Sequence, residues 1–155
     1  MEIRNEIYTD GLSVSIKRRG QCLTVSPVAI QTARAFTAWT HHHLAPPSEV
    51  EIVLGARTGN GTLVGVVFVV DGDVDGTAEL ACLSTDGTPN ASSALLGAAR
   101  KAAHAAGYRH LIVYTWPNEL GTSLDAAGFR PIGQTCTSHG AIRVVWEAST
   151  VGGRR

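Results

Sequence analysis

Several side chains in the first half of this chain have types and spacings suited to proton transfer. His41, His42 and His43 are consecutive near the end of an expected helix, and Glu79 lies within an apolar run. Consecutive helical residues point about 100° apart, so the three histidines cannot bind one metal ion together while helical. A histidine can act as a base near neutral pH, whereas at a helix end it complements the negative end of the helix dipole. Both roles stay open for the histidines, and no metal site is indicated.

Glu79 and Cys82 are neighbours on an expected strand. A carboxylate inside an apolar strand costs free energy unless it faces a site or water, so Glu79 is either a base or a solvent-facing residue. Cys82 has no neighbour in sequence that would lower the pKa of its thiol, which favours a core position over a nucleophile. Cys22 and Cys136 are far away and no CxxC pair occurs, so we expect three reduced thiols, mostly in the core.

The segment after Cys82 has the order strand, loop and helix. Gly87 gives the loop flexibility, and a helix is expected over Ala91–Ala106. The amino end of a helix offers free N–H groups and the positive end of a dipole, which suit a phosphate group. Asp86 would repel a phosphate, so we expect its carboxylate to accept a local backbone N–H in an Asp-Gly turn. The alternative is an ordinary cap, with Thr88-Pro89 starting a helix that binds nothing.

The elements that must position these residues alternate regularly along the chain. Periodicity and turn residues predict strands at Leu12–Lys17, Gln21–Val25, Glu51–Ala56, Thr62–Val70, Thr77–Ser84, His110–Thr115, Phe129–Thr135 and Ala141–Glu147. Two further helices are expected, one starting at Ser26-Pro27 with an apolar stripe of Val28, Ala35, Phe36 and Trp39, and one at Leu120–Ala127. This order predicts an α/β fold with a single mixed, mostly antiparallel sheet flanked by helices. Residues 12–148 form one folded domain in this prediction, and residues 1–11 and 149–155 form flexible ends.

The composition excludes some classes of protein. The 155 residues include 13 basic and 13 acidic side chains, and 44% are hydrophobic, which is enough for one folded core. Proteins that bind nucleic acid tightly usually carry a basic excess, and this chain has none. No apolar run is long enough to span a bilayer and no signal-peptide pattern occurs, so we expect a soluble cytoplasmic protein.

The order of elements, together with Ala126-Ala127-Gly128-Phe129, resembles the GCN5-related N-acetyltransferase (GNAT) superfamily. Cys82–Leu96 and Thr115–Phe129 are most similar to a little-characterised bacterial and phage branch of it. The resemblance implies a GNAT-like fold and acetyl-CoA, or another acyl-CoA, as donor. It also implies transfer of the acyl group to an amine, carried by a small molecule or a macromolecule.

The same resemblance implies roles for particular residues. The base would be Glu79, or His41 or His43 lining the acceptor pocket beside Trp39, and the oxyanion would be held by a backbone N–H near Leu83. The implied cofactor contacts are Cys82, Leu83, Ser84, Gly87, Thr88, Asn90, Ala91, Ser92 and Asn118.

The chain departs from the superfamily's pattern at several of these positions. The usual general-acid tyrosine falls on Leu124. Ser123 is a weak substitute because its hydroxyl is far less acidic, and Tyr114 either serves instead or is a buried structural residue. The phosphate-binding positions, which fall on Gly87, Asn90 and Ser92, also differ from the superfamily's usual residues.

Two other functions stay open. The stretch Tyr114–Phe129 loosely resembles phage Mom proteins, which modify adenine in DNA, although the balanced charge argues against tight DNA binding. A degenerate member of the fold would instead be a non-catalytic binding module. An edge strand such as Ala141–Glu147 would then be available for homodimerisation.

Overall fold

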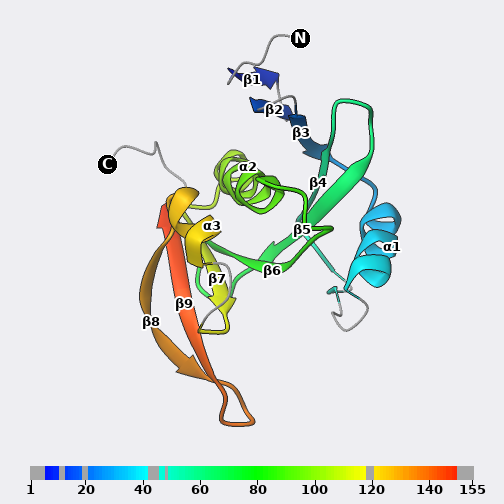
Figure 1. The fold of residues 1–155 in the computed structure, drawn as a ribbon. Coiled ribbons are helices and arrows are strands. Elements are labelled where there is room, and N and C mark those ends of the chain that lie inside the picture. Colours follow the sequence, from blue (N-terminus) through cyan, green and yellow to red (C-terminus); the bar gives the residue numbers. More distant parts are fainter. Residues whose placement is uncertain are drawn as a thin grey trace.

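The computed structural model describes residues 6–10, 13–18, 21–41, 46–47, 49–117 and 121–149. These residues form one sheet with the strand order β1-β2-β3-β4-β5-β6-β7-β9-β8 (Figure 1). Its strands are β1 (Glu6–Asp10), β2 (Ser13–Arg18), β3 (Gln21–Pro27), β4 (Ile52–Arg57), β5 (Leu63–Asp71), β6 (Thr77–Thr85), β7 (His110–Thr115), β8 (Arg130–Cys136) and β9 (Ile142–Ser149). The helices are α1 (Ile30–Thr40), α2 (Ala91–Ala105) and α3 (Gly121–Ala126). Only β6 and β7 pair in parallel, which confirms the predicted mixed, mostly antiparallel sheet.

Helices cover both faces of this sheet, as predicted. The side chains of β5 alternate between the two faces: Val67 and Val69 join the core beneath α2, whereas Val66 and Phe68 join a smaller core beneath α1. Phe36 is the large α1 side chain in that smaller core. None of the described helices is long and apolar enough to cross a membrane.

The start of the first helix differs from the prediction. Ser26 does not cap it, because β3 continues through Pro27, where Ser26 pairs with Gly55 of β4. The helix begins at Ile30, and its N-cap residue Ala29 makes no side-chain bond. The hydrogen bonds between β3 and β4 therefore outweigh the local preference of Ser26 for capping a helix. Pro27 is tolerated because a proline at the end of a strand removes few of these hydrogen bonds. The predicted apolar stripe is also partly wrong: Phe36 is buried, but Trp39 is 76% exposed.

The two ends of the sheet also differ from expectation. Glu6–Asp10, which we expected in a flexible end, forms β1 and pairs with β2. The predicted edge strand Ala141–Glu147 corresponds to β9, which lies between β7 and β8, so β8 is the edge. Every residue of β8 is exposed, and the far end of the β8–β9 hairpin projects away from the helices (Figure 1). Of the three cysteines only Cys82 is buried, so the expectation of mostly core thiols is wrong.

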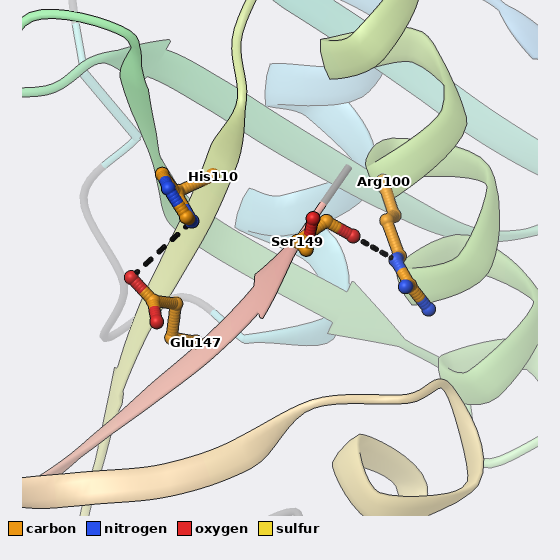
Figure 2. Close-up of polar contacts among 4 residues, drawn as sticks. All are labelled: Arg100, His110, Glu147 and Ser149. Atoms are coloured by element: carbon orange, nitrogen blue, oxygen red, sulfur yellow. Dashed lines mark hydrogen bonds and ion pairs between the residues drawn. The ribbon is translucent and has the colours of Figure 1, made fainter. Parts of the chain in front are cut away.

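Arg100 of α2 forms hydrogen bonds with the last residue of β9 and with the residue that follows α3. Its Nε donates to the Ser149 carbonyl at 2.6 Å (Figure 2). Its Nη1 donates to the Ala127 carbonyl at 3.1 Å. Gly128 has φ +92°, and a Cβ there would meet the Arg100 guanidinium. The missing side chain at residue 128 therefore makes room for this contact.

We expect Gly128→Ala to lower the free energy of unfolding by about 2–3 kcal/mol. A left-handed φ costs alanine about 1 kcal/mol, and displacement of the guanidinium weakens two hydrogen bonds worth ~1 kcal/mol each. Urea unfolding measures the change. The matched control is Gly97→Ala in α2, where no atom lies within 4 Å of the added carbon. That control should be neutral or stabilising, and equal losses in both variants would contradict the explanation.

Candidate functional site

The two parallel strands of the sheet, β6 and β7, separate toward their carboxyl ends. β6 pairs with β7 only over Thr77–Leu80, opposite His110–Val113. Beyond these residues β6 stays paired with β5, and β7 stays paired with β9. A bulge leaves Ala81 without a partner in β5, and it lies where the two strands part. We call the region between residues 81–85 of β6 and residues 114–115 of β7 the β6–β7 wedge.

Backbone groups of β6 face this wedge. The N–H of Asp86 donates to a β5 carbonyl at 3.0 Å. Alternate residues of an antiparallel strand bond to the same neighbour, so Ser84 also faces β5. Leu83 and Thr85 then present their N–H and C=O groups to the other side, toward the wedge. The Thr85 carbonyl is bonded to His41 Nε2 at 3.0 Å, so this backbone is partly used to hold the end of α1.

The amino end of α2 lies directly after this strand and has no side-chain cap. Its N-cap residue Asn90 has φ 71°, a left-handed conformation that asparagine tolerates better than most residues. No acidic residue occupies the first turn. The N–H of Ala91 is bonded to Thr88, but the N–H groups of Ser92 and Ser93 have no partner among the described residues. The helix therefore presents unpaired donors and the positive end of its dipole.

The loop that connects β6 to α2 is organised by Asp86. Its carboxylate accepts the Thr88 N–H at 2.9 Å and the Thr88 hydroxyl at 2.5 Å, which confirms the predicted Asp-Gly turn. Gly87 has φ +93°, a conformation that only glycine adopts without strain. The Asp86 carboxylate thus uses two of its lone pairs within the loop, but its negative charge stays close to the amino end of α2.

An open cavity of about 520 Å³ joins this loop to the end of α1. It is lined by Trp39, Thr40, His41, Thr85, Asp86 and Gly87. Trp39 contacts Phe36 edge to face, with 6.1 Å between ring centroids, and presents the rest of its ring to solvent. Because a carbonyl only accepts hydrogen bonds, His41 Nε2 carries the proton in its bond to Thr85. The structure therefore brings His41 and Gly87, far apart in sequence, to one cavity.

Glu79 lies elsewhere on the same strand, six residues before Thr85 and just before the wedge. It is half-buried and pairs with Ile112 of β7. Ala78 and Leu80 face the core beneath α2, so Glu79 faces the α1 side of the sheet. Burial raises the pKa of its carboxyl, and the negative charge of Asp73 raises that pKa further. The side chain thus has the properties of a carboxylate base that gains its proton more readily than an ordinary glutamate.

The side chains around the bulge mostly belong to the core. Cys82 is buried, and burial raises the pKa of its thiol, which therefore stays protonated at neutral pH. The Ser84 hydroxyl is buried and donates to Thr37 Oγ1 of α1 at 3.3 Å. Leu83 is half-buried against the α2 side. These residues can therefore meet a ligand through their backbone rather than through polar side chains.

The candidate acids lie in contrasting surroundings. Leu124, where the resemblance noted in the sequence would place a tyrosine, is fully buried. Ser123 is half-buried in α3. Tyr114 is 37% exposed beside the wedge, so of its two expected roles that of a buried structural tyrosine is wrong. His43 and Asn118 lie outside the described residues.

Sequence reasoning missed three side chains that the structure associates with this site. Asp73 lies in the β5–β6 turn and acts on Glu79 through its charge. Trp116 follows β7, and Arg143 of β9 lies over its ring, with the guanidinium carbon 4.3 Å from the ring centroid. Neither pairing could be found from spacing, since each depends on which strands become neighbours.

Neither a family model nor a curated protein matches this chain. Solved structures do. The GNAT domain of S. lividans PAT is 19% identical, with a TM-score of 0.66, and the match covers 92% of this chain and 99% of that chain. The aminoglycoside 6'-N-acetyltransferase from Enterococcus faecium is 10% identical, with a TM-score of 0.65, over 84% and 99% of the two chains. A Bacillus subtilis acetyltransferase in complex with CoA is 11% identical, with a TM-score of 0.63, over 82% and 97%. The chain therefore has the GNAT fold, as the order of its elements predicted.

Proposed function

We propose that this chain is an N-acyltransferase that moves an acetyl group from acetyl-CoA to an amine. The observation that carries the proposal is the β6–β7 wedge, which lies beside an uncapped helix end with unpaired N–H donors. A long ligand with an anionic group in its middle suits this arrangement, because its chain can follow the exposed strand edge while its charge meets the helix. The likeness to solved acetyltransferases supports the same assignment.

Acetyl-CoA fits the residues present and would supply the acetyl group as a thioester, so that the amine forms a C–N bond as the C–S bond breaks. The N–H groups of Ser92 and Ser93 and the turn at Asn90 would hold its pyrophosphate. The backbone of Leu83 and Thr85 would bond its amide-containing arm in the manner of a neighbouring strand. Cys82 would contribute backbone only.

The proton chemistry is assigned to side chains that border the wedge. Glu79 would accept the proton that the amine loses, directly or through one water, because its raised pKa makes it a stronger base than an ordinary glutamate. The Leu83 N–H would donate to the developing oxyanion. Tyr114 would take the role of the missing tyrosine, since Leu124 has no proton to donate. His41 would position the end of α1 rather than act as base, because its Nε2 proton is used on Thr85.

Calorimetric titration of the purified chain with acetyl-CoA and with CoA tests the proposal. We expect micromolar affinity for both, within the usual range for enzyme substrates of about 1 μM–1 mM. Release of free CoA in the presence of primary amines should follow. If neither ligand binds, the helix end is an ordinary terminus and acyl transfer is wrong. If both bind but no amine is consumed, a non-catalytic binding module replaces the enzyme.

A further inference from the structure

Among the described residues, no helix covers the α1 side of the sheet formed by β7, β9 and β8. The sheet contacts of α1 are mainly with β4, β5 and β6. Leu111 and Val113 of β7 and Ala148 of β9 face the core beneath α2, so their neighbours in each strand point to the uncovered side. We call the resulting row of side chains the open strip; it consists of Ile112, Tyr114 and Trp116 from the β7 side and Arg143, Val145 and Glu147 from β9.

Register places these side chains in successive pairs. Ile112 lies opposite Glu147, and Tyr114 lies opposite Val145. Continuing the same register puts Trp116 opposite Arg143, and the 4.3 Å distance between the guanidinium carbon and the ring centroid agrees with it. The open strip therefore has a cation at the end nearest the wedge opening and a carboxylate at the other end, about 13 Å away along four residues of strand.

Arg143 is held in place without an anion. The stacking contact fixes the plane of its guanidinium, and its Nε is buried with no hydrogen-bond partner within the described part of the chain. A buried guanidinium N–H without an acceptor costs free energy, and an arginine stacked on an aromatic ring presents its outer N–H groups as a fork that matches a carboxylate. Arg143 is thus a preformed cationic fork, stacked on Trp116 and without an ion-pair partner among the described residues.

Its position relative to the wedge indicates what the anion belongs to. Trp116 directly follows Thr115, the last residue of β7 at the wedge. Glu79 pairs with Ile112, so the proposed base lies beside the Glu147 end of the open strip. Glu147 itself has His110 Nδ1 at 3.5 Å (Figure 2) and Arg130 opposite it, so Glu79 is the carboxylate at this end that can attract an amine. A molecule with both an amine and a carboxylate would therefore bind with its carboxylate on Arg143 and its amine on the side that faces Glu79, which a small amino acid reaches through water.

We propose that Arg143, positioned by Trp116, binds a carboxylate of the acceptor, so that the substrates are amines that carry a carboxylate, such as amino acids. This inference rests on the proposed acyl transfer. It makes Arg143 a specificity-determining residue, and it makes Trp116 a positioning residue. It assigns no role to the cavity between Trp39 and Gly87.

The test compares L-amino acids with the matching carboxamides as acceptors, with acetyl-CoA as donor. We expect kcat/KM to be about 10–100-fold higher for the acids, the factor that a charge-assisted hydrogen bond of 1.5–3 kcal/mol supplies. Arg143→Gln should abolish this preference mainly through KM, and Arg143→Lys should restore only part of it, because lysine lacks the planar fork. The matched control is Arg130→Gln, which removes the same charge from β8, opposite Glu147.

A binding measurement separates this inference from the proposed function. N-acetylated amino acids are titrated into the CoA-loaded protein and compared with their carboxamides. Acid-selective binding that Arg143→Gln removes and Arg130→Gln keeps supports the inference. The inference is wrong, and the proposed acyl transfer is unaffected, if CoA binds but the carboxamides bind or react as well as the acids. The same holds if CoA binds but neither acids nor carboxamides bind or react up to about 10 mM, which is tenfold above the usual upper KM of about 1 mM. Failure of CoA itself to bind contradicts the proposed function instead.

Discussion

Ser92→Asp should weaken the binding of CoA at least about tenfold while making the protein more stable. The added carboxylate would lie where the proposed pyrophosphate meets the α2 amino end. Two charges about 4 Å apart repel with roughly 1 kcal/mol in bulk water and about 4 kcal/mol near a protein surface, and 1.4 kcal/mol already corresponds to a factor of ten. Calorimetric titration with CoA measures the loss.

The stability change runs in the opposite direction for a separate reason. The first turn of α2 contains no acidic residue, and a carboxylate there interacts favourably with the helix dipole and with the unpaired N–H groups of Ser92 and Ser93. The expected gain is about 0.3–1 kcal/mol, seen as a Tm higher by roughly 1–3 °C. A variant that binds CoA less well because it is damaged would instead lose stability, so the two readouts together separate repulsion from misfolding.

Asp86→Asn is the complementary control in the same loop. An asparagine oxygen can still accept from the Thr88 N–H, so the turn is kept while one negative charge near the helix end disappears. CoA should then bind somewhat more tightly, by a factor of about 2–5 for a partly screened charge. Unchanged affinity in both Ser92→Asp and Asp86→Asn would mean that the amino end of α2 does not meet the pyrophosphate.

Much of the fold could be predicted because the governing interactions are local. β7 was predicted at its observed bounds, since a short, mostly apolar run follows the glycine that ends α2. The start of α1 was predicted wrongly, because Ser26-Pro27 is a good local cap. Only the pairing with β4 shows that these residues belong to a strand. Local preference is a weak prior where tertiary pairing competes with it.

The same distinction between local and long-range interactions decides which parts of the candidate site could be predicted. The β6–α2 loop lies within one short segment, so its glycine, its Asp86 turn and the following helix end could be predicted together. The wedge could not, because it depends on a bulge that only the β5 register defines. The stacking of Arg143 on Trp116 likewise depends on β9 lying next to β7, a neighbour relation that periodicity along the chain does not encode.

Glu79→Gln is expected to lower kcat by about 10²–10⁴, the usual contribution of a general base, while the affinity for CoA is unchanged. Glutamine keeps the size of the side chain and loses its ability to accept a proton. Steady-state kinetics with a saturating amine measure the loss, and calorimetry with CoA checks the fold and the donor site. His41→Gln is the comparison, since His41 Nε2 is bonded to the Thr85 carbonyl and should have a much smaller effect. A larger loss in His41→Gln than in Glu79→Gln would make the histidine the base.

The pH profile gives Glu79 a second, independent test. A base works only when deprotonated, and burial together with the charge of Asp73 raises the pKa of this carboxyl. Activity should therefore fall, as the pH is lowered, at a higher pH than the pKa of an ordinary glutamate would give. Asp73→Asn removes the repulsive charge but not the burial, so the pKa of Glu79 drops part of the way and the acid limb of kcat/KM moves to lower pH. Asp75 lies in the same turn, but its charge does not act on Glu79. Asp75→Asn should therefore leave the acid limb of kcat/KM at the same pH. If the Asp73→Asn enzyme is active and its acid limb lies at the same pH as in the unchanged enzyme, the titrating group is not Glu79.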